Sequence, residues 1–264
     1  MTTMKQKKNS KIRHLEYYDL QNTLDTLYAD SGRGKIFNNL MPLIESEENI
    51  RLAYRNIKRN FGSNTSGVDR LTIKDIEKIP ETKFVEVVRK KLQWYKPKAV
   101  RRVEIPKPNG KLRPLGIPAI WDRIVQQCIL QILEPICEAK FSDRSNGFRP
   151  NRSAEHAIAQ AYALMQKSNL HFVVDIDIKG FFDNVNHSKL IKQMWNMGIQ
   201  DKKLLCVIKE MLKAPIILPN GETIYPQKGT PQGGMMLSRL VDTFFSRTSW
   251  TMLLYAENHS ISVA

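Results

Sequence analysis

The sequence has 264 residues, of which 42% are hydrophobic and 25% charged, the composition of a globular protein. Its 41 Lys and Arg outnumber its 26 Asp and Glu, so the formal net charge at pH 7 is +15. This composition excludes a disordered acidic chain and a collagen-like chain, and three cysteines without a C-x-x-C pair exclude a disulfide-stapled mini-protein. No apolar run reaches the ~18–20 residues that cross a bilayer, and the basic start lacks the apolar stretch of a secretory signal. We therefore expect a cytoplasmic protein without a membrane partner.

The positive charge is concentrated in two segments. Residues 1–13 carry five basic side chains and no acid, and residues 89–113 carry ten against the single acid Glu104. The second segment also contains Trp94 and Tyr95. A basic surface with interleaved aromatic rings attracts phosphate backbones through counterion release. The segment predicts a nucleic-acid-binding surface, and a solvated charged face is the alternative.

Apolar residues at helical spacing predict the main helices. The period begins at Ser46 and a helix is expected from there to Gly62, followed by a second helix over residues 82–94. The strongest period covers residues 121–138, where the apolar positions form one stripe. Cys128 lies on that stripe, so we expect it to pack in the core and not to bind a ligand.

Turn residues predict two hairpins. Residues 101–118 have β-prone runs on both sides of Pro108-Asn109-Gly110, and residues 216–225 have Asn220-Gly221 between two short runs. Residues 171–177 read as a buried strand that ends in an acid. Strands and helices mix without a βαβ rhythm, which favours an α+β fold.

Polar loops between these elements predict where further helices begin, and a glycine-rich loop predicts a place where two backbone segments lie close together. Ser153 is a candidate cap for a helix that follows the loop 146–152, and a further helix is expected to start at 186–188. Helical spacing returns over residues 204–212. The loop 228–234, with three glycines, is expected to bring its backbone close to another group.

Three acids gather around the predicted strand. Asp175 and Asp177 share one face of it, and Asp183 follows within nine residues. A carboxylate at the end of a buried strand is costly unless a cation binds it, and Mg²⁺ prefers hard carboxylate oxygens, so Asp177 is a candidate metal ligand. Asp183 is instead a candidate cap of the next helix. His171 and His187 have no ligand spacing and are expected to be structural.

Six segments, in order, resemble the motifs of group II intron-encoded reverse transcriptases (maturases). The segments are SGVDRLT at 66–72, RRVEIPKPNGKLRPLGIP at 101–118, DRIVQQ at 122–127, NGFRPNRSAEHAI at 146–158, VVDIDIKGFFDNVNH at 173–187 and KGTPQGG at 228–234. The resemblance implies the fingers and a partial palm of a right-hand polymerase, with an antiparallel sheet. The expected divisions are a basic extension at 1–45, fingers at 46–170, a partial palm at 171–238 and a divergent, poorly ordered tail at 239–264.

The resemblance also implies roles for particular residues. Asp177 matches the aspartate that holds two catalytic Mg²⁺ ions, one of them with help from the backbone carbonyl at Ile178, and these ions activate the primer hydroxyl. Phe182 matches the aromatic residue that excludes a 2′-hydroxyl. The implied dNTP-binding residues are Lys107, Arg113, Phe182 and Gln232, and the implied nucleic-acid contacts are Arg101, Arg102, Arg149 and Arg152.

The implied activity is RNA-directed DNA polymerisation with intron maturation, and the implied partners are group II intron RNA, an RNA template with a DNA primer, and dNTPs. The family's Tyr-Ala-Asp-Asp box is not found, because residues 255–258 read Tyr-Ala-Glu-Asn and offer one carboxylate in place of two. We therefore expect a truncated product that diverges near Met235 and lacks a complete metal site. The alternatives are an RNA-binding splicing cofactor without polymerase activity, and a diversity-generating or retron-type reverse transcriptase. The loop GFRPNRSA at 147–154 favours the intron group.

Overall fold

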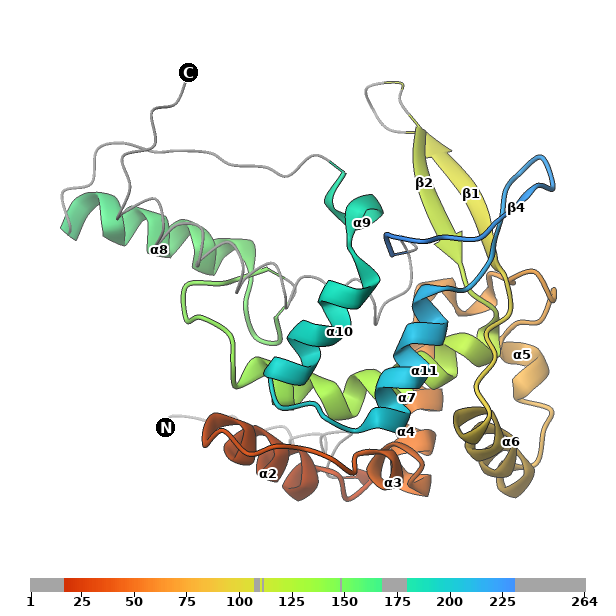
Figure 1. Ribbon diagram of the computed structural model, residues 1–264, viewed down its shortest axis with the longest axis horizontal. Coiled ribbons are helices and arrows are strands. Elements are labelled where there is room, and N and C mark those ends of the chain that lie inside the picture. Colours follow the sequence, from red (N-terminus) through yellow and green to blue (C-terminus); the bar gives the residue numbers. More distant parts are fainter. Residues whose placement is uncertain (1–16, 107–109, 111, 148, 168–179, 231–264) are drawn as a thin grey trace, which may run out of the picture.

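The structure is a computed structural model that describes residues 17–106, 110, 112–147, 149–167 and 180–230. Helices form most of the body, and a twisted hairpin projects from one end of it (Figure 1). The helices are α2 (Gln21–Gly32), α3 (Met41–Ile44), α4 (Glu47–Arg59), the 3-10 helix η1 (Phe61–Asn64), α5 (Ile73–Ile76), α6 (Glu81–Gln93), α7 (Ile120–Glu138), α8 (Ala154–Lys167), α9 (Phe181–Asn184), α10 (His187–Asn196) and α11 (Lys202–Leu212). The strands are β1 (Val100–Pro106), β2 (Leu112–Ile117), β3 (Ile216–Ile217) and β4 (Thr223–Ile224).

Capping residues define where α4 begins and ends. The Ser46 hydroxyl accepts a hydrogen bond from the Asn49 N–H at 3.3 Å, as an N-cap does. Acidic side chains occupy the first turn and basic ones the last, which suits the helix dipole. The helix predicted from Ser46 is confirmed, but it ends before Gly62. Asn60 is extended, and its side chain accepts the Gly62 N–H at 3.3 Å to start the 3-10 helix η1.

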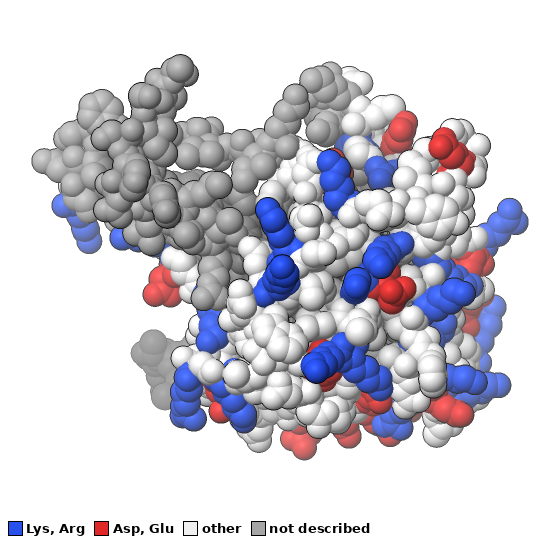
Figure 2. Space-filling model, in the orientation of Figure 1, with Lys and Arg blue, Asp and Glu red and all other residues white. Residues whose placement is uncertain are grey.

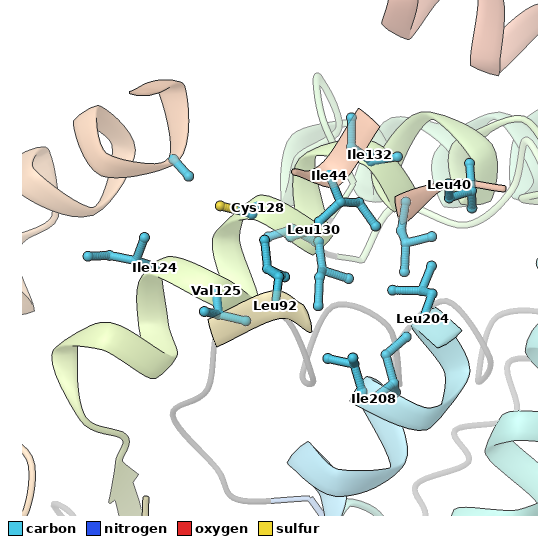
Figure 3. Close-up of a cluster of buried hydrophobic side chains, with 14 of the residues drawn as sticks. Leu40, Ile44, Leu92, Ile124, Val125, Cys128, Leu130, Ile132, Leu204 and Ile208 are labelled. Atoms are coloured by element: carbon cyan, nitrogen blue, oxygen red, sulfur yellow. The ribbon is translucent and has the colours of Figure 1, made fainter. Parts of the chain in front are cut away.

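Helix α7 is the centre of the core. It packs against α2, α3, α4 and α6, and the close-up in Figure 3 shows its side chains between those of α3, α6 and α11. The predicted helix at 121–138 is confirmed, and Cys128 is fully buried among aliphatic side chains. The burial is wider than the predicted stripe, because Asp122, Gln126, Gln127 and Gln131 are buried as well. A helix covered on nearly all sides cannot be recognised from one apolar stripe.

One buried carboxylate joins two distant parts of the core. Asp201 precedes α11, and its Oδ1 accepts the Leu204 N–H at 3.0 Å. Its Oδ2 accepts the N–H groups of Leu40 at 2.7 Å and Met41 at 3.0 Å, at the start of α3. Asp201 is 4% exposed, so these three donors have little access to water. The residue therefore caps two helices that lie 160 residues apart in the sequence.

The two predicted hairpins form one four-stranded sheet, in the order β2-β1-β3-β4. Strands β1 and β2 pair antiparallel, as do β3 and β4, whereas β1 and β3 pair parallel with Val100 opposite Ile216. Gly110 and Gly221 adopt φ values of +76° and +86° at the two turns, a region that glycine enters without steric cost. The described sheet is thus mixed. The predicted palm strand at 171–177 lies outside the described residues.

The later helices follow the sequence signals. Asn186 caps α10 by accepting the Lys189 N–H at 3.0 Å, and the spacing over 204–212 corresponds to α11. Helix α8 begins directly after Ser153, whose hydroxyl lies 3.0 Å from Nδ1 of His156. In the described part of the chain, no helix is both long and apolar enough to cross a membrane.

Candidate nucleic-acid interface

The hairpin β1–β2 is exposed to solvent around its turn and buried at its base, where β1 begins and β2 ends. Arg113 is exposed opposite Ile105, and its side chain makes no hydrogen bond or ion pair with the described residues. Arg102 lies nearer the base opposite Gly116, and its Nε is buried without a hydrogen-bond partner. Lys107 lies outside the described residues. The structure therefore leaves the Arg113 guanidinium available for an anionic ligand.

Arg101 is half-buried, and its guanidinium bonds to the protein's own backbone. Its guanidinium donates to the carbonyl oxygen of Ser66, from Nη2 at 2.7 Å and from Nε at 3.2 Å. The neighbouring Gly67 packs so closely on the start of α7 that a Cβ there would lie 2.7 Å from Cα of Ala119. The SGVD motif thus has a structural use, because it fixes the base of the hairpin. The RNA-contact role predicted for Arg101 remains a prediction, and its observed partner is internal.

Arg123, which no local sequence signal distinguishes, binds the same loop from the other side. It donates to the carbonyl oxygens of Pro118 at 2.9 Å and Gly62 at 2.9 Å, and also to that of Thr65. Burial is the largest influence on this guanidinium and lowers the pKa of Arg123 from its ordinary value. Arg123 belongs to the quoted motif DRIVQQ, but only the folded chain reveals its three carbonyl partners.

The two aromatic residues of the basic segment have different environments. Trp94 is 84% exposed at the end of α6. Tyr95 is half-buried, and its hydroxyl donates to Oδ1 of Asp122 at 3.0 Å. The other Asp122 oxygen accepts the Lys98 N–H at 3.1 Å, which holds the chain leading into β1 against α7. Only Trp94 of this pair presents its ring to a ligand.

The Asp122 carboxyl makes stability depend on pH in a definite direction. Burial, which outweighs the hydrogen bonds from Lys98 and Tyr95, raises the pKa of Asp122. The folded protein therefore binds the proton more tightly than the unfolded chain, and this contribution to stability is present below the unfolded pKa and lost as pH rises through the folded pKa. The quantity to follow is the difference between the free energy of unfolding of the parent and that of the variant Asp122→Asn. We expect this difference to fall as pH rises from about 4. Urea denaturation at a series of pH values measures it.

Asp75 offers a comparison of opposite sign. The N–H and hydroxyl of Thr72 lower the pKa of Asp75, at distances of 2.9 and 3.0 Å from its Oδ2. Its contribution to stability is present above the unfolded pKa and is lost as pH falls through the folded pKa. The difference in unfolding free energy between the parent and Asp75→Asn should therefore rise with pH. If this difference and the one for Asp122→Asn changed with pH in the same direction, the raised pKa of Asp122 would be contradicted.

Arg149 organises its own loop. It forms an ion pair with Glu138 at 2.6 Å and donates to the carbonyl oxygens of Ser142 at 2.6 Å and Ser145 at 2.8 Å. Its side chain is 6% exposed. Arg152 is half-buried, and no hydrogen bond of its side chain to a described residue is present. The observed bonds thus give Arg149 an internal role. The RNA contacts predicted for Arg149 and Arg152 both remain predictions.

Phe182 and the start of the glycine-rich loop lie together. The Phe182 carbonyl accepts the Thr230 N–H at 2.8 Å, and the Val185 carbonyl accepts the Gly229 N–H at 2.8 Å. A Cβ at Gly229 would lie 2.8 Å from the backbone oxygen of Asp183, so this loop makes the close backbone contact that was expected. These two backbone bonds place Phe182, the residue predicted to exclude a 2′-hydroxyl, next to the loop that continues to Gln232. Gln232 itself lies outside the described residues.

Two other polar side chains near α9, those of His187 and Asp183, differ in their surroundings. Nε2 of His187 lies 2.8 Å from the Gly229 carbonyl oxygen, so the expected structural role of His187 is confirmed. The capping role considered for Asp183 is wrong, since Gly180 precedes α9 and Asn186 caps α10. Asp183 instead lies in the first turn of α9 and is exposed.

The predicted metal ligands Asp177 and Ile178, together with His171, lie outside the described residues. Within the described ranges, no group of three or more His, Cys, Asp or Glu side chains is arranged to hold a metal ion. The magnesium site therefore rests on the sequence motif alone.

These features define an α+β chain in which a basic hairpin is fastened to a helical body by the half-buried Arg101 and Arg123. A family model described as "Reverse transcriptase (RNA-dependent DNA polymerase)" matches residues 105–256. The match covers more than half of the chain, so the chain belongs to the reverse transcriptase family. The match continues beyond residue 234, near which the motifs predicted divergence, and that boundary remains a prediction.

Similar curated proteins include products of group II introns. Protein YkfC of Escherichia coli K12 is 35% identical over 223 residues, which are 83% of this chain and 58% of that protein. The group II intron-encoded protein LtrA of Lactococcus lactis is 34% identical over 211 residues, 80% of this chain and 34% of LtrA. The putative COX1/OXI3 intron 1 protein of Saccharomyces cerevisiae is 32% identical, covering 75% of this chain and 23% of that protein. The predicted resemblance is confirmed, and the chain spans less than two thirds of each of these relatives.

A solved structure supports the fold. A chain of the "Partial Cas6-RT-Cas1--Cas2 complex" matches with a TM-score of 0.52 and 20% identity, over 86% of this chain and 36% of that one. At this identity the likeness concerns the fold alone. The α+β class expected from the sequence is confirmed.

Proposed function

We propose that this chain binds group II intron RNA and a template–primer duplex as the fingers and partial palm of a reverse transcriptase. The observation that carries the proposal is the exposed, unpaired Arg113 on a hairpin whose base is fastened by Arg101 and Arg123. A guanidinium pairs with phosphate through two parallel donors, and a fixed hairpin loses little entropy when it does so. The excess of positive charge over residues 89–113 favours the same kind of ligand.

The polymerase part of the proposal rests on Asp177 and Phe182. Magnesium bound at Asp177 would supply activation of the primer 3′-hydroxyl. Phe182, next to the glycine-rich loop, would exclude the 2′-hydroxyl of a ribonucleotide, and Lys107, Arg113 and Gln232 would hold the dNTP. The family membership supports RNA-directed DNA polymerisation as the reaction class. For residues 1–264 we expect RNA binding without primer extension, because residues 255–258 supply one carboxylate where the family motif has two.

The test measures binding of a fluorescent RNA hairpin at increasing salt. We expect affinity to fall steeply with salt, and the double variant Lys107→Gln/Arg113→Gln to reduce the slope of log affinity against log salt by about one to two. The matched control Lys74→Gln/Lys83→Gln removes the same charge from other exposed sites and should keep the parent slope. Asp177→Ala should bind as the parent does. Salt-insensitive binding, or none at low salt, would refute the proposal.

Primer extension with Mg²⁺ and dNTPs separates the two candidate activities. Binding without extension is the expected result and agrees with an RNA-binding splicing cofactor. Extension by the parent that Asp177→Ala abolishes would instead establish a complete polymerase site and overturn the expectation drawn from residues 255–258.

A further inference from the structure

Helix α11 presents a row of lysines to solvent. Lys202, Lys209 and Lys213 are exposed, with Cys206 between the first two. Their spacing of four, three and four residues places all four side chains on one face of the helix. The opposite face is buried against the core by Leu204, Leu205, Val207, Ile208, Met211 and Leu212. The three lysines and Cys206 are called the α11 lysine row below.

The lysine ammonium groups of this row form no ion pair with the described residues, although the exposed Glu210 follows Lys209 on the same helix. Lys202, Lys209 and Lys213 make no hydrogen bond or ion pair through their side chains with the described residues. The adjacent α10 carries exposed Lys189 and Lys192 and no acid. Figure 2 shows Lys and Arg side chains outnumbering acidic ones on the face over these two helices. This surface is not apparent from the sequence, because the lysines of α10 and α11 are spread over 25 residues and do not form a run.

The row leads towards the basic hairpin. Helix α11 runs into β3, which pairs with β1, and the Val100 N–H donates to the Pro215 carbonyl at 2.7 Å. Lys213 therefore lies three residues before β3, the strand through which α11 joins the sheet that carries Arg102 and Arg113. With a rise of about 1.5 Å per residue, the row extends the positive surface by about 16 Å from that sheet.

We propose that the α11 lysine row binds the phosphate backbone of the same RNA that contacts the hairpin. This inference rests on the proposed function, because it requires that the chain binds RNA. Lysine ammonium groups act as point charges and suit phosphates better than base edges. The row contains no aromatic ring on which a base could stack and no apolar centre of the kind that a protein partner requires. Its contacts would therefore be independent of sequence and sensitive to salt.

The triple variant Lys202→Gln/Lys209→Gln/Lys213→Gln tests the proposal with the fluorescent RNA hairpin. We expect affinity to fall at least tenfold at about 0.1 M salt, and the salt slope to decrease by roughly two to three. The control Lys74→Gln/Lys83→Gln/Lys167→Gln removes three charges from other elements and should keep the parent slope. A parent that binds no RNA overturns the proposed function. A parent that binds, with a triple variant of unchanged slope, overturns only the lysine row.

Cys206 gives a second measurement without any mutation. It is exposed, whereas Cys128 and Cys137 are buried, and burial raises the pKa of Cys137 to about 12. A maleimide should therefore modify Cys206 selectively in the folded chain. Saturating RNA should slow this modification several-fold, and high salt should restore its rate. An unchanged rate with bound RNA would overturn the proposal, even if the triple variant binds weakly.

Discussion

Replacing Asp201 by alanine should destabilise the chain by about 3 kcal/mol or more, because three buried N–H groups lose a charged acceptor. The donors belong to Leu40, Met41 and Leu204, at 2.7, 3.0 and 3.0 Å from the carboxylate. Asp201 is 4% exposed, so bulk water has little access to these three donors. Urea denaturation followed by far-UV circular dichroism measures the loss of unfolding free energy.

Two further variants define the origin of that loss. Asp201→Asn keeps one oxygen, so it can retain the bonds to α3 or the bond to α11 but not all three, and its loss should be intermediate. Asp183→Ala removes an exposed carboxylate and should change stability by less than about 0.5 kcal/mol. Equal stability of Asp201→Ala and the parent would show that the double cap contributes little.

Gly67→Ala should cost about 2 kcal/mol or more, although it adds a single methyl group. The new Cβ would lie 2.7 Å from Cα and 2.8 Å from N of Ala119, and 3.0 Å from the Pro118 carbonyl oxygen. These are backbone atoms at the junction of β2 and α7, so neither side can move away independently. The loop that Arg101 and Arg123 hold must shift, and RNA affinity should decrease together with stability.

Gly62→Ala is the matched control in the same loop. A Cβ at Gly62 meets no heavy atom within 4 Å, and its φ is not in the left-handed region. The substitution should be neutral or stabilise by up to about 1 kcal/mol, since alanine loses less backbone entropy on folding. If both variants behave alike, the close approach of Gly67 to Ala119 does not determine how the hairpin is positioned.

Local signals in the sequence determined most of the elements. The apolar periods predicted α4, α6, α7 and α11, and turn glycines predicted both hairpins. Both signals depend only on residues that are close together in the sequence. Caps such as Ser46 and Asn186 are equally local. The six motifs, read in order, indicated the reverse transcriptase family, which the family match confirms.

The candidate site was only partly predictable. Arg113 is exposed as a ligand-binding residue requires, and Phe182 lies beside the glycine-rich loop. Arg101 and Arg149, predicted from the same motifs, donate instead to internal carbonyls and to Glu138. A motif identifies an arginine, but whether its guanidinium faces solvent depends on which acceptors the fold leaves without a partner.

The sequence by itself determined the class of the fold, its helices and hairpins, and its positive charge. Only the tertiary structure decided that β1 pairs parallel with β3, that Asp201 caps α3 as well as α11, and that α11, with its exposed lysines, leads into the strand beside the hairpin. Periodicity and turn chemistry specify a segment from its neighbours in the chain. Pairing between segments more than a hundred residues apart instead depends on which buried donors and acceptors can satisfy one another once the core has assembled.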